Sequence, residues 1–342
     1  MFSHTTVSMG RCGSAAADNR IRRRFRGLGI AVVALATLFP PAAATADDST
    51  GNDSRADVWL ISTRRAARCG QVDFAAEKID FHQLGDDHRW QPADLDSFLR
   101  SDDPDVPTAV FVHGNRAGAN AAIRDGEQVL RRMKRHAGQR SFRLAIWSWP
   151  SDRIAGRQRH DVRIKAAYSD VQAYYLAECL HRIEPEVSVG LVGYSFGARV
   201  ITGALHMLGG GTVAGRGLSE EGFSEEQDAG RTPLRAMLVA AACDAGWLLP
   251  GHRHGLATSR VERIMVTRNG CDPVLRWYPR LYGRRGPQAM GYAGAYCCGD
   301  SRERIEQLGV SCSVGRNHDW NCYVRAPAIE RQLAWYTFLN AP

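Results

Sequence analysis

The amino-acid sequence predicts an α/β fold in which a mostly parallel central sheet carries helices on both faces. Short apolar segments, with the length of buried strands, alternate along the chain with longer segments of helical periodicity. Most of the short segments are continuously apolar, which is typical of parallel strands buried on both sides. No internal repeat and no linker composition interrupts this pattern, so residues 57–342 are expected to form one domain.

Two sets of segments support this fold class. The expected strands are apolar and rich in β-branched or aromatic residues: 57–63, 72–84, 107–112, 142–149, 187–192, 234–242, 263–267 and 310–314. The expected helices have apolar residues three or four positions apart: 94–100, 117–136, 160–182, 198–208 and 329–339. Segment 72–84 is ambiguous because Glu77 and Lys78 interrupt it. Residues 209–230, rich in glycine and then in acidic residues, are expected to form a loop or insertion.

The charge of the chain is concentrated near its N-terminus. The 342 residues carry a formal net charge of +8. Residues 1–46 hold six arginines and one aspartate and account for +5, which leaves +3 for the rest. No long basic run follows, so the sequence predicts no nucleic-acid partner.

Residues 1–46 have the three parts of a signal peptide. A basic stretch at 20–26 precedes an apolar stretch at 28–39, and the small-x-small sequence at 44–46 is typical of a cleavage site. The basic stretch also resembles a twin-arginine signal. Export to the periplasm or the medium is therefore expected, with residues 47–56 as a flexible mature N-terminus. If residues 28–39 stay uncleaved, they are the expected membrane anchor and the only expected membrane contact.

Removal of the signal peptide leaves eight cysteines, and an even number in an exported protein permits disulfides. Cys179 and Cys243 lie in apolar segments and are equally well explained as small buried side chains. Five cysteines lie between residues 271 and 322. At least one bridge is expected among these five.

The motif Gly193-Tyr194-Ser195-Phe196-Gly197 lies between the predicted strand 187–192 and the predicted helix 198–208. This order of strand, tight turn and helix is the context in which a Gly-x-Ser-x-Gly motif presents a nucleophilic serine. Side chains at Gly193 and Gly197 are expected to collide with the neighbouring strand and helix. The free N–H groups at the start of the helix would face a developing oxyanion. A chance occurrence in a glycine-rich chain is the alternative.

Two further motifs accompany this turn. Val112-His113-Gly114-Asn115 ends one predicted strand, and Trp149-Pro150-Ser151 follows the next. Together with the serine motif, they resemble the α/β-hydrolase superfamily, and within it a bacterial family of α/β hydrolases that combines all three. The resemblance covers roughly residues 57–340. It implies the α/β-hydrolase fold and a Ser-His-Asp triad in the chain order serine, acid, histidine.

A serine hydroxyl needs a base to take its proton and a carboxylate to hold that base in the right tautomer. Downstream of Ser195, Asp244 and Asp272 each follow a predicted strand. Asp272 is favoured, because the superfamily most often places the acid after the later strand and Asn-Gly-Cys-Asp-Pro is typical of a loop. Asp244 is the alternative acid, and each aspartate has a plainer explanation as a turn or cap residue. The expected base is His318, between the last predicted strand and the closing helix.

The backbone N–H groups of Asn115 and Phe196 are the expected oxyanion donors. His113 follows a buried strand and precedes Gly114, so its expected role is to brace the turn that carries Asn115. No metal and no organic cofactor is expected, since this chemistry requires neither.

These features predict an exported serine hydrolase that acts on carboxylic esters, the commonest use of such a site, with a small-molecule or lipid-like acyl substrate. The aromatic segments 247–250 and 277–296 are expected either to wall an acyl pocket or to anchor loops on the body of the protein. Two alternatives remain open. One is a catalytically silent binding protein on the same fold, and the other is a membrane-attached lipase-like enzyme or acyltransferase.

Overall fold

The computed structural model describes residues 55–70, 72–156, 158–218, 234–283, 286–299 and 301–340. All of these belong to one compact unit, Thr50–Pro342. The predicted signal peptide, residues 1–46, lies outside the described residues, and so does most of the predicted flexible stretch 47–56. No helix in the described part of the chain is long and apolar enough to cross a membrane.

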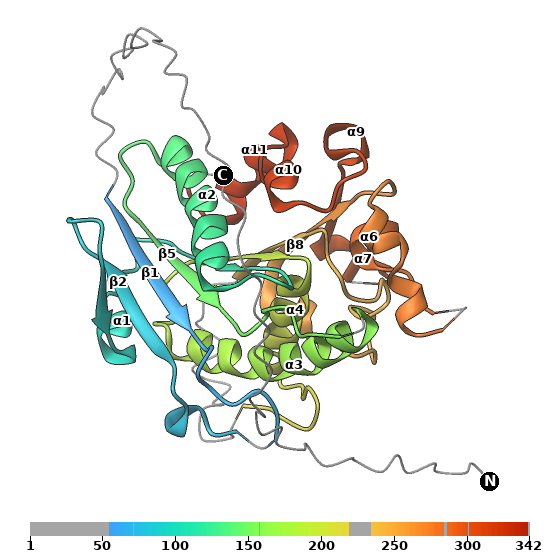
Figure 1. Ribbon diagram of the computed structural model, residues 1–342. Coiled ribbons are helices and arrows are strands. Elements are labelled where there is room, and N and C mark those ends of the chain that lie inside the picture. Colours follow the sequence, from blue (N-terminus) through green and yellow to red (C-terminus); the bar gives the residue numbers. More distant parts are fainter. Residues whose placement is uncertain are drawn as a thin grey trace, which may run out of the picture. The chain divides into compact units, whose positions relative to one another are not determined.

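The described residues form a nine-stranded, mostly parallel sheet (Figure 1). The strands are β1 (Ala56–Ser62), β2 (Asp80–Leu84), β3 (Trp90–Ala93), β4 (Thr108–Val112), β5 (Phe142–Ser148), β6 (Val189–Tyr194), β7 (Leu234–Val239), β8 (Val261–Arg268) and β9 (Ile305–Gly309). Their order in the sheet is β3-β2-β1-β5-β4-β6-β7-β8-β9. Strands β2 and β3 are antiparallel to their neighbours, and all other pairs are parallel. The predicted α/β class with a mostly parallel sheet is thereby confirmed.

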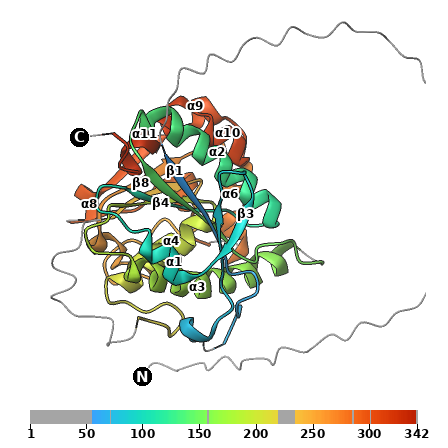
Figure 2. The same cartoon turned by 90° about the vertical axis from the view of Figure 1, so that its left-hand side faces the viewer.

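Helices cover both faces of this sheet. The α-helices are α1 (Leu95–Arg100), α2 (Ala119–Ala137), α3 (Gln158–Arg182), α4 (Phe196–Leu208), α6 (Pro273–Arg276), α7 (Met290–Ala293), α8 (Ser301–Arg304), α9 (Ser311–Val314), α10 (Trp320–Val324) and α11 (Pro327–Tyr336). Short 3₁₀-helices are η1 (Phe74–Ala76), η3 (Ala257–Arg260) and η4 (Tyr278–Leu281). Helices α2, α10 and α11 lie on one face, and α3 and α4 lie side by side on the other (Figures 1 and 2).

Burial explains why the central segments form strands. Every residue of β4, β5 and β7 is buried, as are all residues of β6 except Tyr194. A strand that is covered on both faces of the sheet removes its apolar side chains from water on both faces. A continuous apolar run is therefore stable there. Helix α2 buries one stripe, which includes Val129 and Met133, against β5.

The predicted last strand at 310–314 is wrong. Those residues form α9, and the last strand is β9, which precedes it. Strand β9 is at the edge of the sheet and exposes most of its side chains, so its sequence lacks an apolar run. In the ambiguous segment 72–84, only residues 80–84 are a strand, after the turn of η1. Of the predicted loop 209–230, residues 219–230 lie outside the described residues.

The predicted disulfide is not formed. All eight described cysteines are free thiols, including Cys271, Cys297, Cys298, Cys312 and Cys322. Two cysteines bridge only where their β-carbons approach to about 4 Å, and spacing along a sequence does not determine that approach.

Candidate active site

The candidate site lies at the carboxyl ends of the parallel strands. The chain order of the strands reverses at β4, which has β5 on one side and β6 on the other. Crevices beyond the carboxyl ends of strands at such a reversal are the usual ligand sites of open α/β sheets. Ser195 follows β6 and Asp272 follows β8, while His318 lies between α9 and α10.

Ser195 occupies a strained turn between β6 and α4. Its φ of 53° and ψ of −110° lie in a region that non-glycine residues rarely adopt. Backbone hydrogen bonds hold it there, because its N–H donates to Val239 O at 2.9 Å. Its carbonyl accepts from the N–H groups of Ala198, at 3.2 Å, and Ala242, at 3.1 Å. The end of β7 therefore fixes a conformation that the serine alone would not favour.

Three glycines make room for this turn. A β-carbon on Gly197 would lie 2.0 Å from the carbonyl oxygen of Val112 at the end of β4. One on Gly193 would lie 2.9 Å from the backbone nitrogen of Ala198. One on Gly114 would lie 2.9 Å from ring carbons of Tyr194. These distances are shorter than van der Waals contact, so β4, β6 and α4 approach closely only because these side chains are absent.

The structure brings the three predicted triad residues together. Ser195 Oγ lies 3.0 Å from His318 Nε2, and His318 Nδ1 lies 2.7 Å from Asp272 Oδ2. Ser195 and Asp272 are buried, and the His318 side chain is 16% exposed. A hydrogen-bonded path therefore runs from a serine hydroxyl through an imidazole to a buried carboxylate.

Asp272 is held by four donors in all. Its Oδ1 accepts from the backbone N–H groups of Val274, at 2.9 Å, and Leu275, at 3.0 Å. Its Oδ2 accepts from the Tyr323 hydroxyl at 2.8 Å, besides the contact with His318. Asp272 is thus the N-cap of α6 and the partner of His318 at once, with one oxygen for each task.

The alternative acid, Asp244, is engaged elsewhere. Its Oδ1 accepts from the hydroxyl of Tyr278 at 2.5 Å. Of the two aspartates, it is Asp272 that contacts His318.

The loop that carries His318 is fixed by residues that the sequence did not single out. The hydroxyl of Tyr194 donates to the backbone carbonyl of His318, and its ring packs against the rings of His318 and Trp320. Asn269 Nδ2 donates to Gly315 O at 2.9 Å and to the Tyr323 hydroxyl at 3.1 Å. Tyr194 lies inside the serine motif and Asn269 begins the loop pattern that contains Asp272, but no pattern in the sequence marks Tyr323.

One expected oxyanion donor, Phe196, follows the serine directly, and the other, Asn115, follows Gly114, where an added β-carbon would lie 3.2 Å from Ser195 Cβ. Phe196 is the first residue of α4, so its N–H has no partner within the helix. Among the described residues, neither this N–H nor that of Asn115 donates to a backbone carbonyl. The turn after Asn115 is held by the segment that follows β5, because Arg116 N donates to Ser151 O at 2.8 Å. Free N–H groups at such positions are available to a bound anion.

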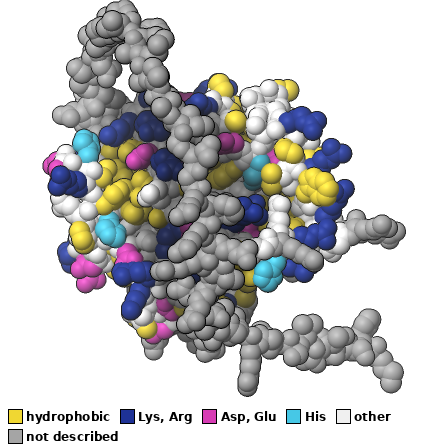
Figure 3. Space-filling model, viewed as in Figure 1, with side chains coloured by type: hydrophobic (Ala, Val, Ile, Leu, Met, Phe, Trp, Pro, Cys, Tyr) yellow, Lys and Arg dark blue, Asp and Glu magenta, His cyan; other side chains and the backbone are white. Residues whose placement is uncertain are grey.

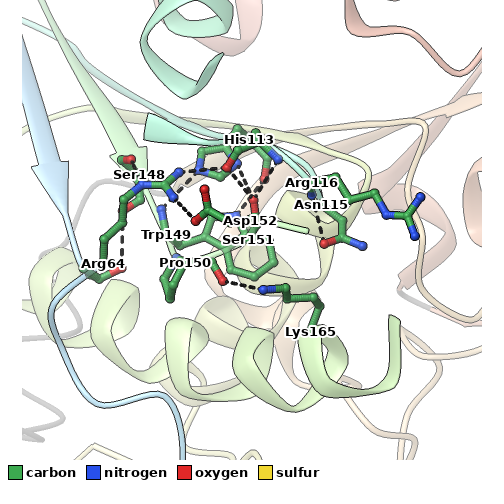
Figure 4. Close-up of polar contacts among 12 residues, drawn as sticks. Arg64, His113, Asn115, Arg116, Ser148, Trp149, Pro150, Ser151, Asp152 and Lys165 are labelled. Atoms are coloured by element: carbon green, nitrogen blue, oxygen red, sulfur yellow. Dashed lines mark hydrogen bonds and ion pairs between the residues drawn. The ribbon is translucent and has the colours of Figure 1, made fainter. Parts of the chain in front are cut away.

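His113 braces this turn from a buried position (Figure 4). Its Nε2 accepts from Trp149 N at 3.1 Å, so Nδ1 carries the hydrogen that is donated to Gly114 O at 2.8 Å. Burial lowers the pKa of His113 to about 3, and the imidazole is therefore neutral. Its ring stacks on Trp149, and Trp149 Nε1 donates to His113 O at 2.9 Å.

The segment after β5 is tied down by side chains from outside it. Ser151 Oγ donates to Gly114 O at 3.1 Å. Arg64, just after β1, donates to Ser148 Oγ at 2.8 Å and pairs with Asp152 at 2.6 Å. Lys165 of α3 donates to Pro150 O at 3.2 Å (Figure 4). These bonds join the ends of β1, β4 and β5 into one rigid support for the turn at Asn115.

The aromatic residues of the segments 247–250 and 277–296 differ in burial, and two of them line a cavity. Trp247 is buried, whereas Trp277 is 58% and Tyr296 is 51% exposed. Tyr278 and Tyr282 line a cavity beside Phe196. In Figure 3, hydrophobic side chains lie exposed among Lys and Arg on the side of the molecule where Figure 1 places α6.

Comparison of the sequence with models of protein families finds no match, and comparison with curated proteins finds none either.

Proposed function

We propose that this chain is a serine hydrolase of the α/β-hydrolase fold that cleaves carboxylic esters. The single observation that carries the proposal is the hydrogen-bonded path from Ser195 Oγ through His318 to Asp272. Its setting on a strand, a strained turn and a helix, in the chain order serine, acid, histidine, supports the same fold and chemistry.

The positions of the nitrogens on His318 define its role in the proposed reaction. With Nδ1–H held by Asp272, Nε2 is free to accept the proton of Ser195 Oγ. The serine oxygen then attacks the ester carbonyl carbon, and His318 passes the proton to the leaving alcohol. A water molecule, deprotonated by the same nitrogen, would release the acid from the acyl-enzyme and restore the serine.

Negative charge that develops on the carbonyl oxygen needs donors already in place. The N–H groups of Phe196 and Asn115 would supply them, with the positive end of the α4 dipole behind Phe196. The neutral His113 supports this arrangement, because it holds the turn before Asn115 without adding a charge that would bind a resting anion.

The proposed enzyme is exported, since residues 1–46 have the pattern of a signal peptide. N-terminal sequencing of protein collected outside the cytoplasm would locate the cleavage, expected after Ala46. An intact N-terminus on a membrane-bound protein would instead favour anchoring through residues 28–39.

A fluorophosphonate probe tests the mechanism directly, because it labels only a serine that is activated as a nucleophile. The full chain should be labelled, and Ser195→Ala and His318→Ala should not be. His160→Ala is the matched control, since His160 is exposed on α3, and it should be labelled like the unaltered chain. Undiminished labelling of Ser195→Ala would reject the mechanism. A folded chain that is never labelled would instead favour a binding protein without turnover.

A further inference from the structure

A cavity of about 370 Å³ adjoins the residue after the candidate nucleophile. It lies between the first turns of α3 and α4 and the segment of η4. Its apolar lining includes Val162 and Ala166 from α3, the ring of Phe196 and the side chain of Leu281. Pockets of this volume hold small organic ligands.

One buried arginine lines this cavity. Arg199 is 4% exposed, and its guanidinium carbon lies 4.5 Å from the ring centre of Trp247 and 5.3 Å from that of Phe196. Its Nε donates to Ser169 Oγ at 3.1 Å. Within the described residues, its two terminal nitrogens donate no hydrogen bond. Arginines are almost never fully buried without an ionic partner, whereas this one contacts two aromatic rings and one hydroxyl.

Two aspartates of the surrounding elements are engaged with other partners. Asp170 pairs with Arg253 at 2.7 Å, and Asp244 accepts from Tyr278 at 2.5 Å. In the described part of the chain, no carboxylate forms an ion pair with Arg199. The cavity lining contains a second arginine, Arg163 at the rim, and no acidic residue. Its electrostatic potential therefore favours an anion.

We propose that this cavity binds a carboxylate of the substrate, so that the preferred substrates are esters carrying a free carboxylate. The proposal rests on the proposed function, because it takes Ser195 as the nucleophile. The planar guanidinium of Arg199 matches a carboxylate with two parallel hydrogen bonds. Arg199 lies four residues after Ser195, about one turn along α4, and Phe196, which follows the serine, lines the same cavity. Esters with a short methylene chain between the ester and the carboxylate are therefore the ones to test.

The two tyrosines of the lining refine this fit. Tyr278 gives its hydroxyl hydrogen to Asp244, and burial raises its pKa well above the ordinary value, so it stays protonated. The hydroxyl of Tyr282 lies 3.3 Å from that of Tyr278 and belongs to a half-exposed side chain. Because the Tyr278 hydrogen goes to Asp244, Tyr282 is the donor in the bond between the two hydroxyls. Tyr282 would have to turn this hydrogen from Tyr278 to a carboxylate held by Arg199, and its exposed position leaves room for that rotation.

Paired substrates test the proposal on the full chain. Monoethyl adipate carries the carboxylate in its acid part, and acetylated ω-hydroxyhexanoate carries it in its alcohol part. For each, the control substrate is the same ester with the carboxylate replaced by a primary amide. We expect kcat/KM for one of the two anionic esters to exceed that of its amide by roughly tenfold to a hundredfold, the range of a hydrogen-bonded charge pair. The favoured member identifies the side of the ester that enters the cavity.

Variants then assign the preference to Arg199. Arg199→Met should remove it while keeping contact with the rings of Phe196 and Trp247, and Tyr282→Phe should reduce it. Arg131→Met is the matched control, since Arg131 is exposed on α2, on the opposite face of the sheet, and it should keep the full preference. Equal kcat/KM for charged and uncharged esters, or a preference that survives Arg199→Met, would overturn the proposal.

A binding measurement separates this proposal from the proposed function. By calorimetry, adipate or ω-hydroxyhexanoate should bind the Ser195→Ala chain and should not bind Ser195→Ala combined with Arg199→Met. No saturable binding of either acid to Ser195→Ala would reject the anion pocket, even if esters are hydrolysed. Binding by a chain that no fluorophosphonate labels would keep the pocket and reject the hydrolase.

Discussion

The hydroxyl of Tyr323 donates to Asp272 Oδ2 at 2.8 Å, and this is the same oxygen that contacts the imidazole of His318. Burial, and then the negative charge of Asp272, raise the pKa of Tyr323, so its phenol stays protonated and can only donate to that carboxylate. Tyr323 thereby fixes the position of the oxygen that orients His318, although it does not touch the serine. It is a positioning residue in the proposed mechanism.

Tyr323→Phe should lower kcat by roughly tenfold, because Asp272 Oδ2 loses a charge-assisted hydrogen bond while the ring packing is kept. The free energy of unfolding should fall by about 1–3 kcal/mol for the same reason. Ester hydrolysis rates and urea titrations measure the two effects.

Tyr336→Phe is the matched control for this substitution. Tyr336 is also buried near the C-terminus, and its hydroxyl donates to Glu306 at 3.1 Å, away from the triad. The Tyr336→Phe variant should have a lower free energy of unfolding and an unchanged kcat. An unchanged kcat in Tyr323→Phe would show that the other donors suffice to hold Asp272.

Asp272→Asn should lower kcat by roughly 10³–10⁴-fold, and it should lower the free energy of unfolding by about 1–3 kcal/mol because the buried Tyr323 hydroxyl loses its acceptor. The backbone N–H groups of Val274 and Leu275 require an oxygen at the Oδ1 position, so the new amide nitrogen must replace Oδ2. Its hydrogens would then face two donors, His318 Nδ1–H and the Tyr323 hydroxyl. His318 would have to turn or adopt the tautomer that cannot take the proton from Ser195.

Asp244→Asn distinguishes the two acids that follow predicted strands. The new side-chain amide can still accept from Tyr278 through its oxygen, so kcat should fall by less than tenfold. A larger loss of kcat in Asp244→Asn than in Asp272→Asn would assign the acid role to Asp244 and contradict the observed contact.

Sequence patterns predict the parts of the fold that are buried on both sides. The apolar runs of β4, β5, β6 and β7 have no stable alternative to the middle of a sheet. Edge elements carry no such signal, because β3 has no buried residue and β9 has one. Val310 and Val314 suggested a strand, yet they are four residues apart and both buried, which is equally the spacing of one helical turn in α9.

At the candidate site, the sequence indicates the residues that belong to motifs. It misses the residues whose role depends on contacts that form only in the folded chain. Ser195, Gly197 and His113 are marked by their neighbours along the chain. Tyr323 reaches Asp272 across 51 residues, and Arg199 stands out only because no carboxylate of the described residues forms an ion pair with it. Such relationships depend on tertiary packing, which no local pattern encodes.

Gly197→Ala tests the close approach of β4 and α4. The added methyl group would lie 2.0 Å from the backbone carbonyl oxygen of Val112. Neither the backbone of residue 197 nor that of Val112 can move away without distorting the turn at Ser195. The free energy of unfolding should fall by about 1–3 kcal/mol, and fluorophosphonate labelling should be lost. Gly270→Ala is the matched control, since a β-carbon there meets nothing within 4 Å, and it should stay within about 0.5 kcal/mol of the unaltered chain.

The pKa of His113 predicts how stability depends on pH. Burial lowers it to about 3 in the folded protein, against 6.5 for an ordinary histidine. Between these values the unfolded chain binds a proton at this residue and the folded one does not, so acid favours unfolding. The contribution of His113 is complete above pH 6.5 and is lost, at up to about 1.4 kcal/mol per pH unit, as the pH falls toward 3.

His206 and His254 also have lowered pKa values, so the unaltered chain should lose stability in acid through more than one group. His113→Gln isolates the contribution of His113, because glutamine can still accept from Trp149 N–H and does not titrate. Urea titrations from pH 7 down to pH 4 should give a slope shallower by about one proton than that of the unaltered chain. His160→Gln, on the surface of α3, controls for the exchange of a histidine for a glutamine. If His113→Gln and the unaltered chain have parallel slopes, His113 is protonated in the folded protein, and it could not then accept the hydrogen bond from Trp149 that braces the turn at Asn115.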